Sequence, residues 1–371
     1  MNVTGKEPLS ISGSSGNTSA LNYMPQLDTL RAFAVIAVLV EHWLSDRIWL
    51  KIVPFGMLGV TLFFVLSGFL ITQILLQSKV RSGNKDPGIR HLLKQFYIRR
   101  TLRIFPIYYI TIFILLALNI QNISAIFPWF FFYASNIYFY LINDWAGPLS
   151  HFWTLAVEEQ FYIIWPLIIL LTPKKHLLKA ISGIILTAML TRAVLFLYSD
   201  QTDYNATFIS ILTPSCMDCF GLGAILAYYR VFSSRSFQFK GRIAVIFLLI
   251  NFLSIIILLL SKESVLSMFL FKFNASVIFM LLISKVSTGF NGPLKIIFEN
   301  RFLMYLGKIS YGIYLFHHFI PMLYSWLKLP SISNIYIRFF IMGIFLLILS
   351  SISWYVIEKP VNNLKNKFRY D

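Results

Sequence analysis

Ionisable side chains lie inside apolar stretches of this 371-residue chain, where each one needs either a partner or a function. Arg31 and His42 are separated by ten residues in the segment LDTLRAFAVIAVLVEHW. Eleven helical positions turn through about 1100 degrees and rise roughly 16 Å, so both side chains face one side of a helix. A snorkelling arginine and an interfacial histidine have the same spacing. The functional interpretation is a polar site that reaches across the membrane.

A pair of acids occurs in the segment HFWTLAVEEQFYIIWP, which begins at His151. Glu158 and Glu159 lie about two turns below its outer end, at a depth that resembles that of His42. A carboxylate bonded to one imidazole nitrogen raises the basicity of the other, as general-base catalysis on a hydroxyl requires. Two adjacent acids cannot both face one way. We expect one to act with His42, the alternative being that it only satisfies a buried His or Tyr, and the other to be structural or solvated.

Two more segments contain candidate binding residues. Ser67 lies in GMLGVTLFFVLSGFLIT, whose small residues permit close helix packing; it has no GxSxG elbow, and we expect it to line the site. Arg99, Arg100 and Arg103 cluster in FYIRRTLRIFPIYY. Membrane topology alone explains such a cluster. Guanidinium groups also bind phosphates bidentately, which would anchor a nucleotide or pantetheine-linked donor.

A late segment, FLMYLGKISYGIYLFHHFIP, places Tyr311, Tyr314 and His317 at helical spacings, with His318 beside them. Adjacent histidines on a continuous helix face different directions. The sequence also lacks an HExxH motif and a spaced set of Cys and His. We therefore expect no metal site.

The segment that contains Cys216 and Cys219 carries a CxxC with no second pair, which is typical of small core residues. Asp218, between the two cysteines, needs a partner within the membrane, and Arg192 is one candidate.

The composition indicates a membrane protein. Hydrophobic residues make up 57% of the chain and charged residues only 13%, against roughly 25% in soluble domains. So much apolar surface cannot be buried in one core, and lipid is its natural solvent. The same composition, with only two Cys, excludes a disordered chain and a disulfide scaffold.

The formal net charge of +17 would fit nucleic-acid binding, but the position of the charges argues against it. Residues 104–173 contain no Lys or Arg, whereas residues 79–103 contain eight. Such segregation is typical of membrane topology. We expect contact with membrane lipid and none with nucleic acid.

The apolar stretches predict an all-α, polytopic membrane helix bundle with about ten transmembrane helices. Basic loops on alternate sides favour cytoplasmic N- and C-termini. Residues 126–142 are nearly long enough to cross but would invert the later loops, so we interpret them as interfacial or re-entrant. The expected spans are 28–45, 55–77, 104–120, 152–172, 177–198, 208–229, 243–261, 265–284, 303–327 and 336–357.

Three regions follow from this pattern. Residues 1–26, rich in Ser, Gly and Asn, are expected to form a disordered cytoplasmic tail. Residues 27–360 form the transmembrane domain, and residues 361–371 form a basic cytoplasmic tail. The loops are too short for a separate enzyme module, so any chemistry must take place among the helices.

Taken in order, these segments resemble the acyltransferase 3 family of integral-membrane acyltransferases. The resemblance covers the chain from about Leu27 to Pro360 and ends in the motif EKP. It implies an O-acetyltransferase that moves an acetyl group from cytoplasmic acetyl-CoA to a hydroxyl of an extracytoplasmic glycan, such as lipopolysaccharide O-antigen. It also implies a multi-pass protein of the bacterial inner (cytoplasmic) membrane.

The family's essential Arg and His correspond to Arg31 and His42, and its acid corresponds to Glu158. The resemblance therefore implies that His42, oriented by Glu158, deprotonates the acceptor or carries the acyl group itself. Arg99, Arg100 and Arg103 would bind acyl-CoA, the donor substrate, without a metal. Candidate substrate-binding residues are Ser67, His151, Trp153, Tyr311 and His317.

The acceptor would be a lipid-linked or polymeric glycan. This sequence has Thr61 and Thr154 where many members have an acid and a Ser, which affects the expected substrate contacts. It lacks the extracytoplasmic hydrolase-like domain that some members carry, so a separate extracytoplasmic transferase is a candidate partner. A transporter of acyl groups or lipid-linked sugar is the alternative function, although no inverted repeat is evident.

Overall fold

The structure, a computed structural model, describes residues 23–44, 53–82, 88–200, 202–233, 249, 251–254, 256, 264–330, 332–368 and 370. Within these ranges the chain is helical and has no strand. The longer helices are α1 (Pro25–Trp43), α2 (Phe55–Ser82), α3 (Ile89–Ala117), α6 (Phe152–Leu171), α7 (Lys174–Leu197), α9 (Thr213–Phe232), α11 (Ser264–Val286) and α16 (Ile335–Ser353). The shorter ones are α4 (Ile123–Phe131), α5 (Ser135–Ile142), α8 (Asp203–Ser210), α12 (Pro293–Phe298), α13 (Arg301–Lys308), α14 (Ser310–Phe316), α15 (Phe319–Trp326) and α17 (Lys359–Asn363).

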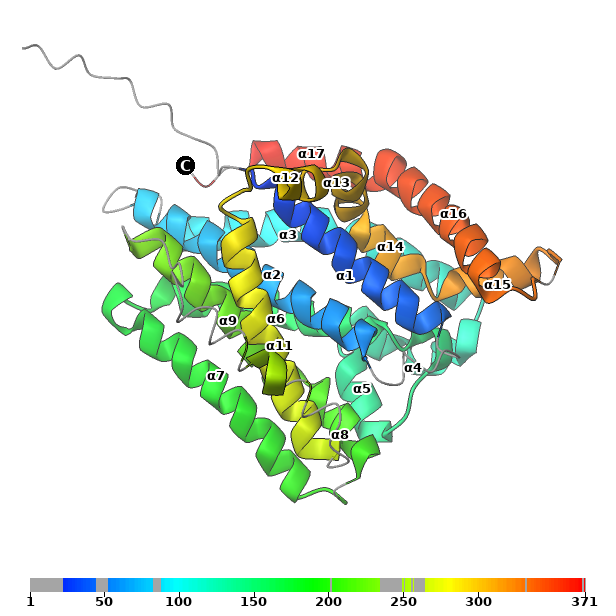
Figure 1. The fold of residues 1–371 in the computed structure, drawn as a ribbon, viewed down its shortest axis with the longest axis horizontal. Coiled ribbons are helices and arrows are strands. Elements are labelled where there is room, and N and C mark those ends of the chain that lie inside the picture. The colour runs from blue at the N-terminus through cyan, green and yellow to red at the C-terminus, as the bar shows by residue number, and fades with distance from the viewer. Residues whose placement is uncertain are drawn as a thin grey trace, which may run out of the picture.

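Helices α7 and α16 lie on opposite flanks of the bundle, with α1, α2 and α6 between them (Figure 1). The most extensive helix pair is α2 with α9, followed by α1 with α2. Glycines permit this close approach: a Cβ atom at Gly68 would collide with the Phe220 carbonyl, and one at Gly223 with the Val65 carbonyl. Small residues at such positions are typical of helix packing in membranes.

The two faces of α7 show how the bundle meets its surroundings. Its inner face is a buried row at helical spacing: Leu177, Ile181, Ile185, Ala188 and Arg192. Its outer face carries the exposed residues Leu186, Leu190, Val194 and Leu197. An apolar outer face indicates contact with lipid rather than water.

The described residues contain six helices long and apolar enough to cross a membrane, or seven if the bent pair of α8 and α9 counts as one span. The protein is therefore a multi-pass membrane protein in character. The predicted count of ten spans is not confirmed, and the cytoplasmic placement of both termini stays a prediction. The predicted span 243–261 lies mostly outside the described residues. Residues 126–142 fall in α4 and α5, whose nine and eight residues are too few to cross.

The prediction of one continuous helix over 303–327 is wrong. The chain forms α13, α14 and α15 there, with breaks at Ile309 and at the pair His317 and His318. Pro321 has no N–H, so it cannot donate to the carbonyl of His317 four residues earlier. The indole Nε1 of Trp43 on α1 donates to that carbonyl instead, at 3.2 Å.

Asp218 has the expected partner. An Arg192 Nη2 to Asp218 Oδ2 distance of 2.6 Å joins α7 to α9, and both side chains are at most 1% exposed. The buried charges therefore neutralise each other within the bundle. Cys216 and Cys219 are buried free thiols, as expected of core residues.

Candidate active site

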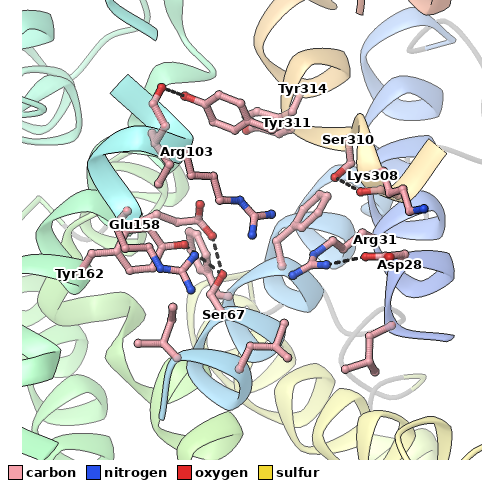
Figure 2. Close-up of a pocket in the computed structure, with 18 of the residues that line it drawn as sticks. Asp28, Arg31, Ser67, Arg103, Glu158, Tyr162, Lys308, Ser310, Tyr311 and Tyr314 are labelled. Carbon is pink, nitrogen blue, oxygen red and sulfur yellow. Dashed lines mark hydrogen bonds and ion pairs between the residues drawn. The ribbon is translucent and has the colours of Figure 1, made fainter. Parts of the chain in front are cut away.

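A cavity of about 620 Å³ lies between α1, α2, α3, α6, α13 and α14 (Figure 2). Its acidic and basic lining residues are Asp28, Arg31, Arg100, Arg103, Glu158, Lys308 and Lys365. Five of these carry positive charge and two carry negative charge. A ligand that fills the cavity is therefore expected to be anionic.

Arg31 enters the cavity from α1 with a partner from its own helix. Its Nη1 lies 2.7 Å from Asp28 Oδ1, three residues earlier. Tyr23, which precedes α1, donates its hydroxyl to the same carboxylate. Burial and the Asp28 carboxylate raise the pKa of Tyr23, which keeps this hydroxyl a neutral donor. The pair fixes the position of Arg31 while its guanidinium still lines the cavity.

Arg100 and Arg103 enter from α3 and differ from Arg31. Within the described part of the chain, neither makes a hydrogen bond or an ion pair; Arg100 lies over the ring of Tyr162 at 5.4 Å. Arg103 keeps accessible surface inside the cavity, and Figure 2 shows its guanidinium extended into this space. The Glu158 carboxylate acts on both guanidinium groups electrostatically but forms no direct ion pair with them. Their N–H groups are therefore available to phosphate oxygens.

The structure does not bring Arg99 to the cavity. Its Nη1 donates to the carbonyls of Lys365 at 3.0 Å and Phe368 at 2.8 Å, and its guanidinium lies 5.1 Å from the ring centroid of Tyr370. Arg99 therefore fastens the C-terminal segment to α3. Adjacent residues on a helix differ by about 100 degrees in direction, which separates Arg99 from Arg100.

Glu158 lies in the cavity and accepts a hydrogen bond from Ser67 Oγ at 2.8 Å (Figure 2). The hydroxyl of Tyr162 lies 3.4 Å from the same Ser67 Oγ. Among the described residues, Glu158 makes no hydrogen bond with His42, so the expected pairing of these two is not found. Glu158 lies seven residues beyond His151 on α6, about 10 Å along the axis, and reaches the level of Arg31 instead.

A tyrosine and a threonine form the end of the cavity nearest to His151. The hydroxyls of Thr154 and Tyr314 are hydrogen-bonded at 2.7 Å, and Thr154 Oγ1 also lies 2.9 Å from the His151 carbonyl. Both Thr154 and Tyr314 line the cavity, whereas His151 does not. His42, His317 and His318 do not line the cavity either. They lie behind Tyr314, whose ring centroid is 5.3 Å from that of His317.

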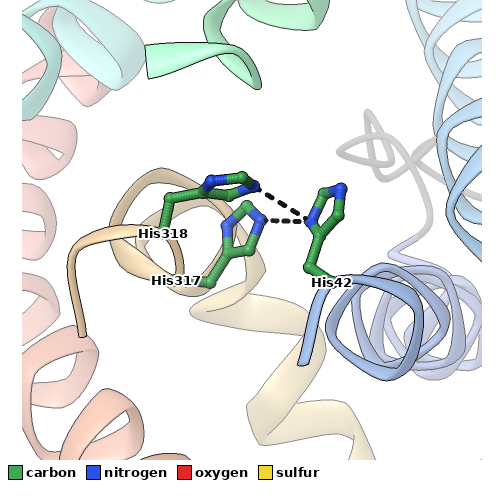
Figure 3. Close-up of side chains that lie close together, drawn as sticks. All are labelled: His42, His317 and His318. Carbon is green, nitrogen blue, oxygen red and sulfur yellow. Dashed lines mark hydrogen bonds between the residues drawn. The ribbon is translucent and has the colours of Figure 1, made fainter. Parts of the chain in front are cut away.

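Behind that pair, His42 meets the two histidines at the break between α14 and α15 (Figure 3). His42 Nδ1 lies 2.8 Å from His317 Nε2 and 3.2 Å from His318 Nε2. His317 Nδ1 lies 2.5 Å from the Tyr314 carbonyl oxygen, which only a protonated nitrogen can approach as a donor. His317 Nε2 is then an acceptor, and His42 Nδ1 donates to it. This leaves the lone pair of His42 on Nε2, the state that a general base requires.

The three remaining predicted binding residues, His151, Trp153 and Tyr311, lie in different places. His151 stacks on His318 with ring centroids 4.8 Å apart, and its Nε2 lies 3.1 Å from the Leu315 carbonyl oxygen. Trp153 packs edge-on against Phe64 and does not line the cavity. Tyr311 does line it. Most of the predicted residues therefore lie in the cavity or among the histidines, whereas Arg99 and Trp153 lie in neither.

The sequence interpretation missed several residues of both parts. A continuous helix over 303–327 would turn His318 away from His317, but Pro321 is a sequence signal for a break in that helix. Asp28 stands three residues before Arg31, a spacing that predicts an ion pair on a helix. Lys308 lies inside the expected span 303–327, where a charged residue is itself a signal. Lys365 had no local signal, and only the fold brings both residues to the cavity.

Comparison with known proteins connects this geometry to a family. The model described as "Acyltransferase domain" (Acyl_transf_3) matches residues 24–357. The chain belongs to the acyltransferase 3 family. The match contains the cavity except for Tyr23, Asn362 and Lys365, and it contains His42, His317 and His318.

Two curated relatives of this acyltransferase 3 chain are named for peptidoglycan O-acetylation. Peptidoglycan O-acetyltransferase OatA of Listeria monocytogenes is 32% identical over 319 residues, which cover 80% of this chain and 49% of that protein. YrhL of Bacillus subtilis, provisionally named for the same activity, is 30% identical over 373 residues, which cover 91% of this chain and 55% of that protein. The chain thus spans about half the length of these relatives. No solved structure matches it.

Proposed function

We propose that this protein is an O-acetyltransferase of the bacterial cytoplasmic membrane that moves an acetyl group from acetyl-CoA to a hydroxyl of a cell-wall glycan. Two relatives are named for peptidoglycan, which favours that acceptor over lipopolysaccharide O-antigen. The proposal rests on one observation. The cavity contains Arg100 and Arg103, which make no ion pair among the described residues, and His42 lies behind the Thr154–Tyr314 end of the same cavity.

The donor would enter the cavity from the end of α1 that carries Tyr23. Arg100 and Arg103 would bind the CoA phosphates, and Arg31, held by Asp28, would place the pantetheine arm. The thioester would then lie near Thr154 and Tyr314. It would reach His42 once the Tyr314 side chain turns away from Thr154.

His42 would act on an acceptor that approaches from the opposite side. Its Nε2 takes the proton of the glycan hydroxyl while the hydroxyl oxygen attacks the thioester carbonyl. The carbon–sulfur bond then breaks, and the departing CoA sulfur takes the proton from His42. The hydrogen bond from His42 Nδ1 to His317 Nε2 holds the ring in the required tautomer, the role first expected of Glu158.

Replacement of the base tests this proposal. In vesicles of purified protein with labelled acetyl-CoA and soluble peptidoglycan fragments, we expect His42→Ala to lower covalent transfer by on the order of 100- to 10,000-fold. His176→Ala, on the exposed face of α7, is the matched control and should keep activity. Melting temperature and gel filtration would show that both variants fold.

Three outcomes would contradict the proposal. Full activity of His42→Ala would remove the base. Label that crosses the membrane without joining a glycan would support a transporter. Acetylation of lipopolysaccharide rather than wall glycan, seen in cells with and without the protein, would overturn the acceptor. The chain spans about half the length of its relatives, so the transfer could require a separate transferase. Intact cells contain such a partner, and for this reason the assay in cells is included.

A further inference from the structure

The histidine group behind the cavity has the arrangement of a ligand set for a metal ion. One nitrogen each from His42, His317 and His318 lies within 4.8 Å of the other two. Two of the three separations are 2.8 and 3.2 Å. Nitrogens bound to one tetrahedral Zn²⁺ at about 2.0–2.1 Å stand about 3.3 Å apart. A metal ion therefore fits among these atoms with small side-chain adjustments.

The protonation pattern also favours a cation at this point. His317 Nδ1 donates to the Tyr314 carbonyl oxygen, so its Nε2 presents a lone pair to the other rings. A backbone carbonyl that accepts from the second nitrogen is the usual support of a histidine ligand. His42 Nδ1 faces both His317 Nε2 and His318 Nε2. A neutral His42 ring carries only one proton, so it cannot donate fully to both nitrogens. Either a proton or a metal ion would satisfy three converging nitrogens.

The break in the helix makes the set possible. His317 and His318 are neighbours in sequence, and on a continuous helix they would point about 100 degrees apart. Here they lie between α14 and α15, and both rings turn toward His42 (Figure 3). His42 is exposed, His317 is fully buried and His318 is half-buried. The group therefore has an open side for entry and a buried side that fixes the ligands.

We propose that His42, His317 and His318 form a binding site for a divalent transition-metal ion, with Zn²⁺ as the best match. Three neutral imidazoles with one open coordination position suit Zn²⁺, whereas Mg²⁺ and Ca²⁺ prefer oxygen ligands. The ion takes the place of the proton on His42 Nδ1. This site is separate from the proposed function. When the ion occupies Nδ1 of His42, the proton moves to Nε2, and His42 can no longer act as the base.

Zn²⁺ binding to the full chain, purified in detergent without a polyhistidine tag, tests the site. After dialysis against Zn²⁺ and removal of free ion, we expect one bound Zn²⁺ per chain by mass spectrometry of the metal. His42→Gln and His318→Gln should each weaken binding by about 10-fold or more, because each removes a ligand. His176→Gln, far along the chain on the exposed face of α7, should bind as the unaltered protein does.

X-ray absorption at the zinc edge gives a second measurement, with scattering from imidazole rings expected in the unaltered protein and reduced in His318→Gln. His317→Gln removes a buried ring and could disturb the fold. The test therefore relies on His42→Gln and His318→Gln, whose rings are more exposed. Absence of stoichiometric Zn²⁺, or equal binding by all variants, would overturn the site. Since bound metal is measured rather than acetyl transfer, this result is independent of the proposed function.

Discussion

At the residue scale, three neighbouring arginines of α3 have different tasks because their partners differ. Arg99 is bonded to two backbone carbonyls of the C-terminal segment. Arg103 faces the cavity and, within the described part of the chain, makes no hydrogen bond and no direct ion pair. An unpaired cation is available to a ligand, whereas a bonded one stabilises the fold.

This difference predicts separate effects on activity and stability. Arg103→Gln should raise KM for acetyl-CoA by about 10- to 100-fold with little change in kcat, because hydrogen bonds to charged groups contribute about 1.5–3 kcal/mol and the phosphates do not react. Arg99→Gln should leave KM near its normal value and lower the melting temperature. Initial rates in vesicles and thermal unfolding in detergent check both, and an equal rise of KM in both variants would contradict the assignment.

Site residues were predictable by type and depth, but their pairing was not. The sequence placed Arg31, Glu158, Ser67 and Tyr311 among the functional residues, and the structure brings them to one cavity. It paired Glu158 with His42 on depth alone. Sequence spacing fixes direction within one helix, whereas contact between two helices also depends on how each is rotated against the other.

At the element scale, glycines set the distance between α2 and α9. A side chain at Gly68 would meet the backbone of Phe220, which cannot yield as the end of a flexible side chain can. Gly68→Ala should therefore lower the free energy of unfolding by about 1–3 kcal/mol. Gly183→Ala, on the exposed face of α7 with nothing within 4 Å, should gain about 0.5–1 kcal/mol from helix propensity. Unfolding in detergent measures both; no loss in Gly68→Ala would show that the helices can separate freely.

The sequence predicts long, uniformly apolar helices well, but it does not predict where such a helix is interrupted. Residues 177–198 were expected to form a helix, and α7 covers nearly the same range. Residues 303–327 were expected to do so as well, but the hydropathy of this segment does not reveal that Trp43 would replace the hydrogen bond lost at Pro321. That replacement comes from another helix and makes the break tolerable within the bundle.

At the scale of the whole molecule, helix ends fall on two sides in a consistent way. Gly56 N at the start of α2 donates to Glu41 at the end of α1, at 2.8 Å. Lys79, near the end of α2, donates to the carbonyls of Ile169 at 3.0 Å and Thr172 at 2.7 Å, at the end of α6. The start of α1, the end of α2 and the end of α6 therefore share one side, and His42 lies toward the other. The proposed transfer, from a donor on one side to an acceptor on the other, requires this separation.

The sidedness can be measured on α7, whose two ends should lie on opposite sides of the membrane. Lys175 is exposed at the basic end beside Thr172, and Asp200 is exposed beyond the other end. If basic residues mark the cytoplasm, a membrane-impermeant maleimide should label Asp200→Cys in intact cells and Lys175→Cys only after lysis. Cys216 and Cys219 are buried, so the unaltered chain serves as the unlabelled control. Labelling of Lys175→Cys alone would invert the topology and place the cationic cavity outside, away from the cytoplasmic acetyl-CoA that we propose as the donor.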